Sequence, residues 1–598
     1  MKGKMKERVL RYFILSATAI VLLFGAFSLL GFRDVTGWRF GVRNMLGGFV
    51  LLFLSQIFTG RDLTRPAWRP MLPLVFIGLW AYGAVISISA GEPGRMEDLN
   101  GYILTFLGGW IFTAFLGMAG NQWRILKNPL VVCNFLLISW LSVGAVIFMS
   151  YFLFTGMRLT PPDMIAVLST NFQESMEFLE SHIGWMGFFS VLLFLIVYEI
   201  GLFYLVRAGF SESAVKFDKY QCVMYGGRAL VLIGVILSAF HWIPRIYPVH
   251  DYRIAAQYIR LMRGAERNHE ENINALQVDT SSYRVPGSVI IVIGESANRD
   301  HMKAFRPDHL TETTPWLSSQ TVDSGFYIFP NSWSNHTVTV QALSMYLSGM
   351  NQYNGEKPEQ TVTITDVANK AGYSSYWISN QAPSAGNLME ALSEEASAAT
   401  YWTNPTGNPD ENILPLLRKI PQGKNNFIII HLEGSHDRHD ARYPAGYELV
   451  RTEGHNEREN IYDTSIRYND DVLKKIYEYA RANLNLQAMV YCSDHGEDMV
   501  GFHGAGTFTW AMARIPMWIY LSPEYIARNP ETDAALRANL NKPFTNDLIF
   551  DTVCGILKAP NNHYRAQYDL LSPDYSLTKE EAFTRHGKIR IAADPDYQ

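Results

Sequence analysis

The stretch Val289-Ile290-Ile291-Val292-Ile293-Gly294-Glu295-Ser296 is the part of the chain that decides its fold. Five β-branched residues in a row are typical of a strand buried on both faces of a parallel sheet. Gly294 lets the chain turn where the strand ends, and Glu295 places a charge at that point. This carboxylate has two interpretations: an acid at the N-terminus of a helix over residues 296–303, or a metal ligand.

Two further apolar runs, 427–430 and 486–490, also end in polar residues of the kind that bind metals. These residues are His431, Glu433 and His436 after the first run, and Asp494, His495, Glu497 and His503 after the second. In α/β enzymes the chemistry lies where strands end in polar loops. Imidazole and carboxylate together form the ligand set of a zinc-type site. Asp-His-Gly can also be an ordinary strand-to-helix turn, so both interpretations stay open at this point.

The segment 334–341 offers two hydroxyls two residues apart, those of Thr337 and Thr339. A threonine hydroxyl is a weak nucleophile that needs a metal or a base to activate it. Considered alone, both threonines also fit an ordinary strand.

Strands and helices alternate after residue 285, which predicts a mostly parallel sheet covered on both faces. The expected strands are 288–293, 326–329, 374–379, 426–431, 487–492 and 515–520, and the expected helices between them include 363–371, 410–419 and 465–482.

The first 245 residues are dominated by apolar runs, and we expect about seven spans long enough to cross a bilayer. They run roughly over residues 10–31, 43–59, 71–90, 102–119, 129–155, 185–207 and 226–245. The basic N-terminus has no small-residue cleavage site after its apolar stretch, so we interpret it as an uncleaved anchor. The net charge of −5 gives no indication of nucleic-acid binding.

Loop charges predict the orientation of these spans. The N-terminus and the loops 60–70, 119–128 and 206–228 are basic, whereas the loops 91–101 and 157–184 are acidic and fall on the opposite side. The first outer loop, with Arg33, Arg39 and Arg43, goes against the rule. The balance places the N-terminus in the cytoplasm and the soluble part outside. Within loop 157–184, an amphipathic helix from Asp163 to about Glu180 either lies on the outer membrane surface or packs against the soluble domain.

The chain resembles the phosphoethanolamine transferases, membrane enzymes whose catalytic domain is related to alkaline phosphatases and sulfatases. Order and spacing match over roughly residues 285–560, and the matching segments are 294–296, 313–317, 334–341, 434–436, 462–466, 493–497 and 502–504. A looser match, Ser169 to Glu177, lies in the membrane half. The resemblance implies a transmembrane domain (1–245), a linker with a helix (246–285), a zinc-dependent catalytic domain (286–572) and a C-terminal tail (573–598).

The resemblance also implies roles for single residues. Glu295, Thr339, Asp494 and His495 would bind the primary zinc, with Thr339 as the nucleophile and Thr337 as the alternative. His436 and His503 would lie opposite, as acid or base and where the family holds phosphate or a second zinc. Glu497 would sit beside them, and Asn380 would contact substrate.

The implied reaction moves phosphoethanolamine from phosphatidylethanolamine, through a phosphoethanolamine-threonine intermediate, to an acceptor such as lipopolysaccharide core, lipid A or another envelope glycan. The implied place is the periplasmic side of a Gram-negative inner membrane. Only four cysteines are present, so the disulfides of the lipid A-modifying relatives are missing, and the chain looks closer to the core-modifying type. Cys492 and Cys554 are expected to be buried free thiols. A glycerolphosphate transferase of the lipoteichoic acid synthase type is the alternative, because only the donor lipid separates the two. A sulfatase is disfavoured, since residues 333–345 hold no Cys-x-Pro-x-Arg or Ser-x-Pro-x-Arg segment.

Overall fold

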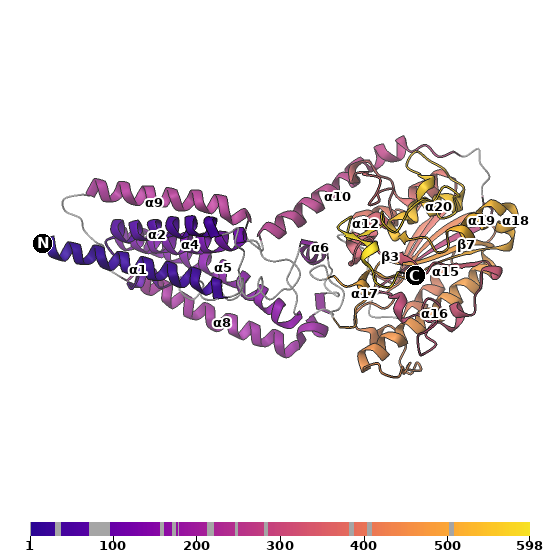
Figure 1. Cartoon of the computed structure of the whole chain (residues 1–598), viewed down its shortest axis with the longest axis horizontal. Helices are drawn as coiled ribbons and strands as arrows, with labels where there is room; N and C mark the ends of the chain where they lie inside the picture. Colours follow the sequence, from indigo (N-terminus) through magenta and orange to yellow (C-terminus); the bar gives the residue numbers. More distant parts are fainter. Residues whose placement is uncertain are drawn as a thin grey trace. The chain divides into compact units, whose positions relative to one another are not determined.

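The computed structural model of the chain forms two compact units, which we describe separately (Figure 1). The first unit comprises residues 1–160 and 182–254, and the second comprises residues 161–181 and 255–598. The structure describes residues 2–29, 38–70, 96–155, 161–169, 175–176, 179–211, 221–245, 249–279, 285–381, 388–403, 409–500 and 508–597.

The first unit consists of long apolar helices, as expected for a transmembrane domain. Its helices are α1 (Lys2–Leu29), α2 (Trp38–Thr59), α4 (Met96–Gln122), α5 (Lys127–Thr155), α8 (Gly184–Gly209) and α9 (Gln221–Trp242). Among the described residues, three helices are long and apolar enough to cross a membrane, namely those over 127–154, 184–209 and 222–241. Six of the seven expected spans coincide with these six helices, and the seventh, 71–90, lies outside the described residues. The count of seven therefore stays a prediction.

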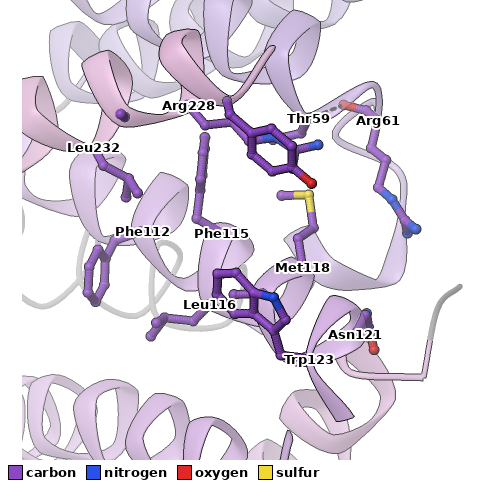
Figure 2. A pocket seen from close by; sticks show the side chains of 13 residues that line it. Thr59, Arg61, Phe112, Phe115, Leu116, Met118, Asn121, Trp123, Arg228 and Leu232 are labelled. Atoms are coloured by element: carbon purple, nitrogen blue, oxygen red, sulfur yellow. Dashed lines mark hydrogen bonds between the residues drawn. The ribbon is translucent and has the colours of Figure 1, made fainter. Parts of the chain in front are cut away.

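Buried polar groups of this first unit are bonded between helices. The Gln56 side-chain amide on α2 donates to the Ser16 hydroxyl (2.7 Å) and to the Tyr12 carbonyl (3.2 Å) on α1. Such bonds satisfy polar atoms that would otherwise lie unpaired in an apolar surrounding. Figure 2 shows a pocket lined mostly by apolar side chains, together with Thr59, Arg61, Asn121 and Arg228. Its volume is about 300 Å³.

The core of the second unit is a seven-stranded sheet in the order β2-β8-β7-β1-β6-β4-β5. The strands are β1 (Ser288–Gly294), β2 (Phe326–Ile328), β4 (Ser374–Ser379), β5 (Ala399–Trp402), β6 (Asn426–His431), β7 (Leu486–Ser493) and β8 (Met517–Leu521). All neighbours pair in parallel except β8, which runs antiparallel to β7 and β2. The predicted mostly parallel sheet is confirmed with all six expected strands, whereas β5 was not expected.

Each face of this sheet carries its own hydrophobic layer. Along β1, Val289, Ile291 and Ile293 join the layer that includes α12 (Thr339–Tyr346), α13 (Ile364–Lys370) and α20 (Ile549–Leu557). Ile290 and Val292 join the layer formed by α11 (Pro315–Ser318), α15 (Leu414–Leu417) and α16 (Glu457–Asn483). Figure 1 shows α20 and α16 on opposite sides of the strands. The continuous β-branched run in β1 follows from this burial on both faces.

Part of the loop 157–184 belongs to the second unit. The helix α6 (Pro161–Ser169) contacts α12, and Glu180 pairs with Arg438 at 3.0 Å. These contacts support the alternative in which the loop packs against the soluble domain. Of the single helix predicted from Asp163 to about Glu180, the structure describes α6 at Pro161–Ser169, helical residues at 175–176 and a π-helix at Leu179–Ile183. Residues 170–174 and 177–178 lie outside the described residues, so the full extent of the helix stays a prediction.

The boundary between the units falls inside α10 (Val249–Ala275), which was predicted to be part of a linker. Residues 255–275 of this helix belong to the second unit, where the His269 imidazole contacts the Asp366 carboxylate of α13 at 3.0 Å. The helix is therefore partly an element of the soluble domain.

The stretch 573–598, predicted to be a tail, is instead packed into the second unit. Tyr575, Leu577, Ala582 and Ile591 are buried in the same hydrophobic layer as α20. Asp594 is buried and forms an ion pair with Arg514. The polar composition of this stretch was misleading because its few apolar residues are the ones that face the core.

Candidate metal centre

Two acidic residues meet because β1 and β7 are neighbouring parallel strands. Gly294 at the end of β1 lies opposite Ser493 at the end of β7, and the Asp494 amide donates to the Gly294 carbonyl at 2.9 Å. Glu295 and Asp494, which follow these residues, therefore leave the sheet at the same edge. This edge is where an α/β sheet places its site.

Glu295, Asp494 and His495 form a buried cluster whose ligand atoms all lie within 4.8 Å of one another. The His495 Nε2 atom lies 3.4 Å from Glu295 Oε1 and 3.4 Å from Asp494 Oδ2. Two carboxylates in a buried place need a cation to offset their charge, because an uncompensated buried charge is costly. The set of oxygen and nitrogen donors suits Zn²⁺.

Neighbouring groups hold the three donors in orientations that suit a metal. The His495 Nδ1 atom contacts the Gly496 carbonyl at 2.9 Å, so the proton sits on Nδ1 and the Nε2 lone pair faces the cluster. Asp494 Oδ1 accepts from the backbone amides of Ser296 and His495. Asp494 Oδ2 is buried and accepts no hydrogen bond from the residues that the structure describes. Burial raises the pKa of the Asp494 carboxyl, an effect that a bound cation would counter.

Thr339 completes the cluster as the first residue of α12. Its hydroxyl donates to Glu295 Oε2 at 3.3 Å and lies 3.2 Å from His495 Nε2. The structure thus brings together all four residues of the predicted primary zinc site. The strand interpretation of Thr337 and Thr339 is wrong: Thr339 begins a helix, whose N-terminus favours an anion. Thr337 is fully buried two residues before it.

The loop after β6 packs directly on the backbone of Glu295. Gly434 has φ of +59°, and the Ser435 amide donates to the Glu295 carbonyl at 2.9 Å. A Cβ at position 434 would lie 2.5 Å from that carbonyl oxygen and 2.8 Å from the Glu295 nitrogen. Position 434 therefore requires glycine for two reasons, its left-handed conformation and its close approach to a ligand residue.

Gly434→Ala is expected to destabilise the protein by about 3 kcal/mol, because it combines left-handed strain with a clash. We also expect zinc affinity to fall by about tenfold or more, since the clash displaces Glu295. Thermal unfolding and titration against a competing chelator measure the two effects. Gly446→Ala is the matched control: Gly446 has φ of +86°, and no atom of the described residues lies within 4 Å of its Cβ position, so only about 1 kcal/mol of strain is expected. Equal zinc affinities for the two variants would contradict the clash.

The predicted residues beyond this cluster have separate surroundings. His436 follows the Gly434–Ser435 contact with Glu295, and His503 lies outside the described residues. Glu497 is buried, with its carboxylate 3.6 Å from the Arg458 guanidinium. The Asn380 side chain donates to Asp410 Oδ1 (2.8 Å) and accepts from the Thr403 hydroxyl (2.5 Å). The predicted substrate contacts of Asn380, His436, Glu497 and His503 stay predictions.

Sequence reasoning did not single out three residues that support the cluster. The Gln381 amide donates to Glu295 Oε2 at 3.3 Å and to the Leu432 carbonyl at 2.9 Å. Asn546 donates to the Asp494 carbonyl at 2.7 Å and accepts from the Asn335 amide at 2.8 Å, which ties the threonine loop to the Asp494 loop. Asp410 accepts from the Glu433 and Gly434 amides. Gln381 could have been predicted as a site residue because it follows a predicted strand. Nothing in the sequence around Asn546 or Asp410 indicates their roles.

The chain is similar to known proteins over the part that holds this cluster. The family described as Sulfatase matches residues 288–557. The chain is 26% identical over 425 residues to phosphoethanolamine transferase OpgE of Escherichia coli K12, covering 66% of this chain and 74% of that protein. It is 23% identical over 394 residues to phosphoethanolamine transferase EptC of the same organism, covering 58% of this chain and 66% of that protein.

A solved structure has a similar fold over most of the chain. It is the integral membrane protein lipooligosaccharide phosphoethanolamine transferase A (EptA) from Neisseria meningitidis, with a TM-score of 0.54 and 17% identity. The similarity covers 83% of this chain and 97% of that structure.

The apolar N-terminal helices and the carboxylate–imidazole cluster at the end of a mostly parallel sheet define a membrane-bound, metal-dependent enzyme of the sulfatase and alkaline phosphatase superfamily. Within that superfamily, the chain is similar to the phosphoethanolamine transferases named above.

Proposed function

We propose that the protein transfers phosphoethanolamine from phosphatidylethanolamine to a glycan of the cell envelope, with lipopolysaccharide core or lipid A as the acceptor. The observation that carries this proposal is the Thr339 hydroxyl at 3.2–3.3 Å from two members of the Glu295, Asp494 and His495 cluster. A hydroxyl in this position fits a covalent nucleophile next to a metal. The names of the relatives support the choice of the transferred group.

Glu295, Asp494 and His495, with the Thr339 oxygen, are the residues that would hold a Zn²⁺ ion. A bound zinc ion would lower the pKa of the Thr339 hydroxyl and neutralise charge on the phosphate oxygens. Their fit is supported by Asp494 Oδ2, which is buried and has no hydrogen-bond partner within the described part of the chain. It is also supported by the contact of His495 Nδ1 with the Gly496 carbonyl, which leaves the Nε2 lone pair for a metal. We infer one such ion in the primary site, and His436 with His503 as the place for phosphate or a second ion.

The reaction that we propose has two displacements at phosphorus. First, the Thr339 oxygen bonds to phosphorus while the bond from phosphorus to the diacylglycerol oxygen breaks, and diacylglycerol leaves with a proton. Second, an acceptor hydroxyl bonds to phosphorus and the bond to Thr339 breaks, which returns the threonine hydroxyl. His436 and His503 are proposed as the groups that move these protons. The N-terminus of α12 adds partial positive charge near the phosphate.

The loop charges and the membrane helices support a place on the periplasmic side of a Gram-negative inner membrane, with the donor lipid in the adjoining leaflet. We propose that residues 286–572 form the catalytic domain on that side of the membrane, together with the stretch 573–598.

Mass spectrometry of lipopolysaccharide, separated into core and lipid A, tests the proposal in cells with and without the gene. A phosphoethanolamine increment that depends on Thr339 supports it, and the fragment that carries the increment identifies the acceptor. The purified full chain, incubated with phosphatidylethanolamine alone, should carry phosphoethanolamine on the peptide that contains Thr339. Labelling of that peptide by phosphatidylglycerol instead would overturn the proposed donor lipid and favour the glycerolphosphate alternative.

Removing the metal with a chelator is expected to lower transfer by at least about 100-fold, because Thr339 then lacks its activating group. The unfolding temperature should fall as well, since a ligand that binds only the folded state stabilises it by mass action. Adding Zn²⁺ back should restore both. Full transfer activity in a preparation shown by elemental analysis to hold no metal would contradict the assignment.

A further inference from the structure

A second group of metal-binding side chains lies apart from the Glu295 cluster and shares no residue with it. It consists of His301, His309 and Asp463, whose ligand atoms, one from each residue, lie within 4.8 Å of one another. His301 closes a short turn after β1, His309 lies in the loop that follows, and Asp463 is on α16. A third imidazole, that of His455, adjoins them.

The Asp463 carboxylate is fully buried and is surrounded by imidazoles. Its Oδ1 atom lies 2.7 Å from His301 Nδ1, and its Oδ2 atom lies 2.9 Å from His455 Nδ1 and 3.1 Å from the Thr452 hydroxyl. The three imidazole rings lie 5.7 to 6.3 Å apart, centroid to centroid. Three imidazoles around one carboxylate are more nitrogen donors than a simple ion pair needs.

His309 points most directly to a ligand. Its Nδ1 atom lies 2.8 Å from the Thr311 carbonyl oxygen, which can only accept, and 3.3 Å from the Thr311 amide nitrogen. The shorter contact favours a proton on Nδ1 and a lone pair on Nε2. Nε2 is buried and has no hydrogen-bond partner among the described residues, although a buried polar atom without a partner is costly. Metal-binding histidines commonly donate the other ring proton to a carbonyl in this way.

We propose that His301, His309 and Asp463 bind a divalent transition-metal ion of the zinc type, with His455 holding the second oxygen of Asp463. Imidazoles with one carboxylate suit Zn²⁺, whereas Ca²⁺ and Mg²⁺ prefer sets made of oxygen donors. Ligand atoms about 3.4 Å apart are expected around a tetrahedral Zn²⁺. The three ligand atoms here lie within 4.8 Å of one another, so a metal would require side-chain adjustments within that distance.

The ion would fix the turn that follows the catalytic ligand Glu295. Tyr462, next to Asp463, donates its hydroxyl proton to the Ser296 carbonyl at 2.7 Å and accepts from the Asn298 amide at 2.9 Å. Its ring also lies edge-on to the ring of His301, with centroids 5.0 Å apart. A metal that joins His301 and His309 to α16 therefore holds the segment 296–309 against the helix, in a structural role.

The test measures zinc binding to the purified full chain in an Asp494→Asn background, in which the primary site is disabled. After chelation and reloading with Zn²⁺, this variant is expected to retain at least one bound equivalent and to gain unfolding temperature with Zn²⁺. Adding His309→Ala or His309→Gln should remove one equivalent and abolish most of that gain. Circular dichroism checks that each variant is folded. Two substitutions of His309 are used so that the test still stands if one of the two variants does not fold.

His563→Ala in the same background is the matched control. His563 contacts Glu356 at 3.0 Å in another partly buried histidine–carboxylate pair, so its loss should leave the zinc content unchanged. Equal zinc content and equal Zn²⁺-dependent stabilisation with and without His309 would overturn the second site. That result would leave the Thr339 assignment untouched, because transfer by the chain with an intact Asp494 is measured separately.

Discussion

Replacing Thr339 with alanine is expected to abolish transfer and to leave the protein folded. The substitution removes the attacking oxygen, so the loss should be at least about 10³-fold, equivalent to about 4 kcal/mol of transition-state stabilisation. The hydroxyl makes weak contacts of 3.2 and 3.3 Å, so the free energy of unfolding should change by only about 1 kcal/mol. Phosphoethanolamine release from a labelled donor and thermal unfolding of the full chain measure the two quantities.

Two further variants decide between the hydroxyls. Thr339→Ser keeps an oxygen at the same place and should retain measurable transfer and the covalent adduct. Thr337→Ala should keep the adduct on Thr339, because the Thr339 hydroxyl lies 3.3 Å from Glu295 Oε2 and 3.2 Å from His495 Nε2. Transfer that survives in Thr339→Ala and disappears in Thr337→Ala would show that Thr337 is the nucleophile.

Replacing Asp594 with alanine is expected to destabilise the soluble domain by about 3 kcal/mol. Both carboxylate oxygens bind the Arg514 guanidinium, and Oδ2 also accepts from the Trp333 indole at 2.8 Å. The carboxylate is fully buried, so its loss leaves the indole proton and part of the guanidinium without a partner. Thermal unfolding of the full chain measures the change.

The same ion pair predicts a loss of stability in acid. Burial alone would raise the pKa of Asp594, but the hydrogen bonds and charge of Arg514 lower it below the ordinary value. A carboxyl whose pKa is lower in the folded state stabilises the protein above its unfolded pKa and loses that contribution as the pH falls through the folded pKa. The difference in stability between the native chain and Asp594→Ala should therefore shrink below about pH 4.

Asp596→Ala is the matched control for Asp594. Asp596 also contacts Arg514, at 2.8 Å, but its side chain is 48% exposed. Solvent screening limits such a pair to about 1 kcal/mol or less. An equally large loss of stability in Asp596→Ala would contradict the inference that burial makes the Asp594 ion pair the stronger one.

Much of the sheet could be predicted from the sequence, because the signal for a buried parallel strand is local. The β-branched run of β1 and the apolar runs of β6 and β7 carry that signal in consecutive residues. The strand β5 was missed because Ala399–Trp402 is short and half-exposed at the edge of the sheet, where no continuous apolar run is required. Cys492 and Cys554 are both buried and free, as expected.

The donors at the site could also be predicted, since each follows directly on a strand or belongs to a recognisable segment. Their supports could not be predicted. Asn546 lies 52 residues from Asp494, and Gln381 lies 86 residues from Glu295. A hydrogen bond between such residues leaves no periodic trace in either segment. The helical start at Thr339 was likewise hidden, because Thr and Val have the composition of a strand.

The sequence by itself determined the class of fold, the membrane-embedded N-terminal half and the identity of Glu295, Thr339, Asp494 and His495. Residue type and local periodicity suffice for the class of fold and the apolar helices, whereas the four site residues follow from the resemblance to a known family. Only the tertiary structure decided that the segment after Ser572 belongs to the core, that Gly434 presses on Glu295, and that three histidines gather around Asp463. Each of these features depends on contacts between segments distant in sequence. Such contacts stabilise only the folded chain, so neither segment alone carries a signal for them.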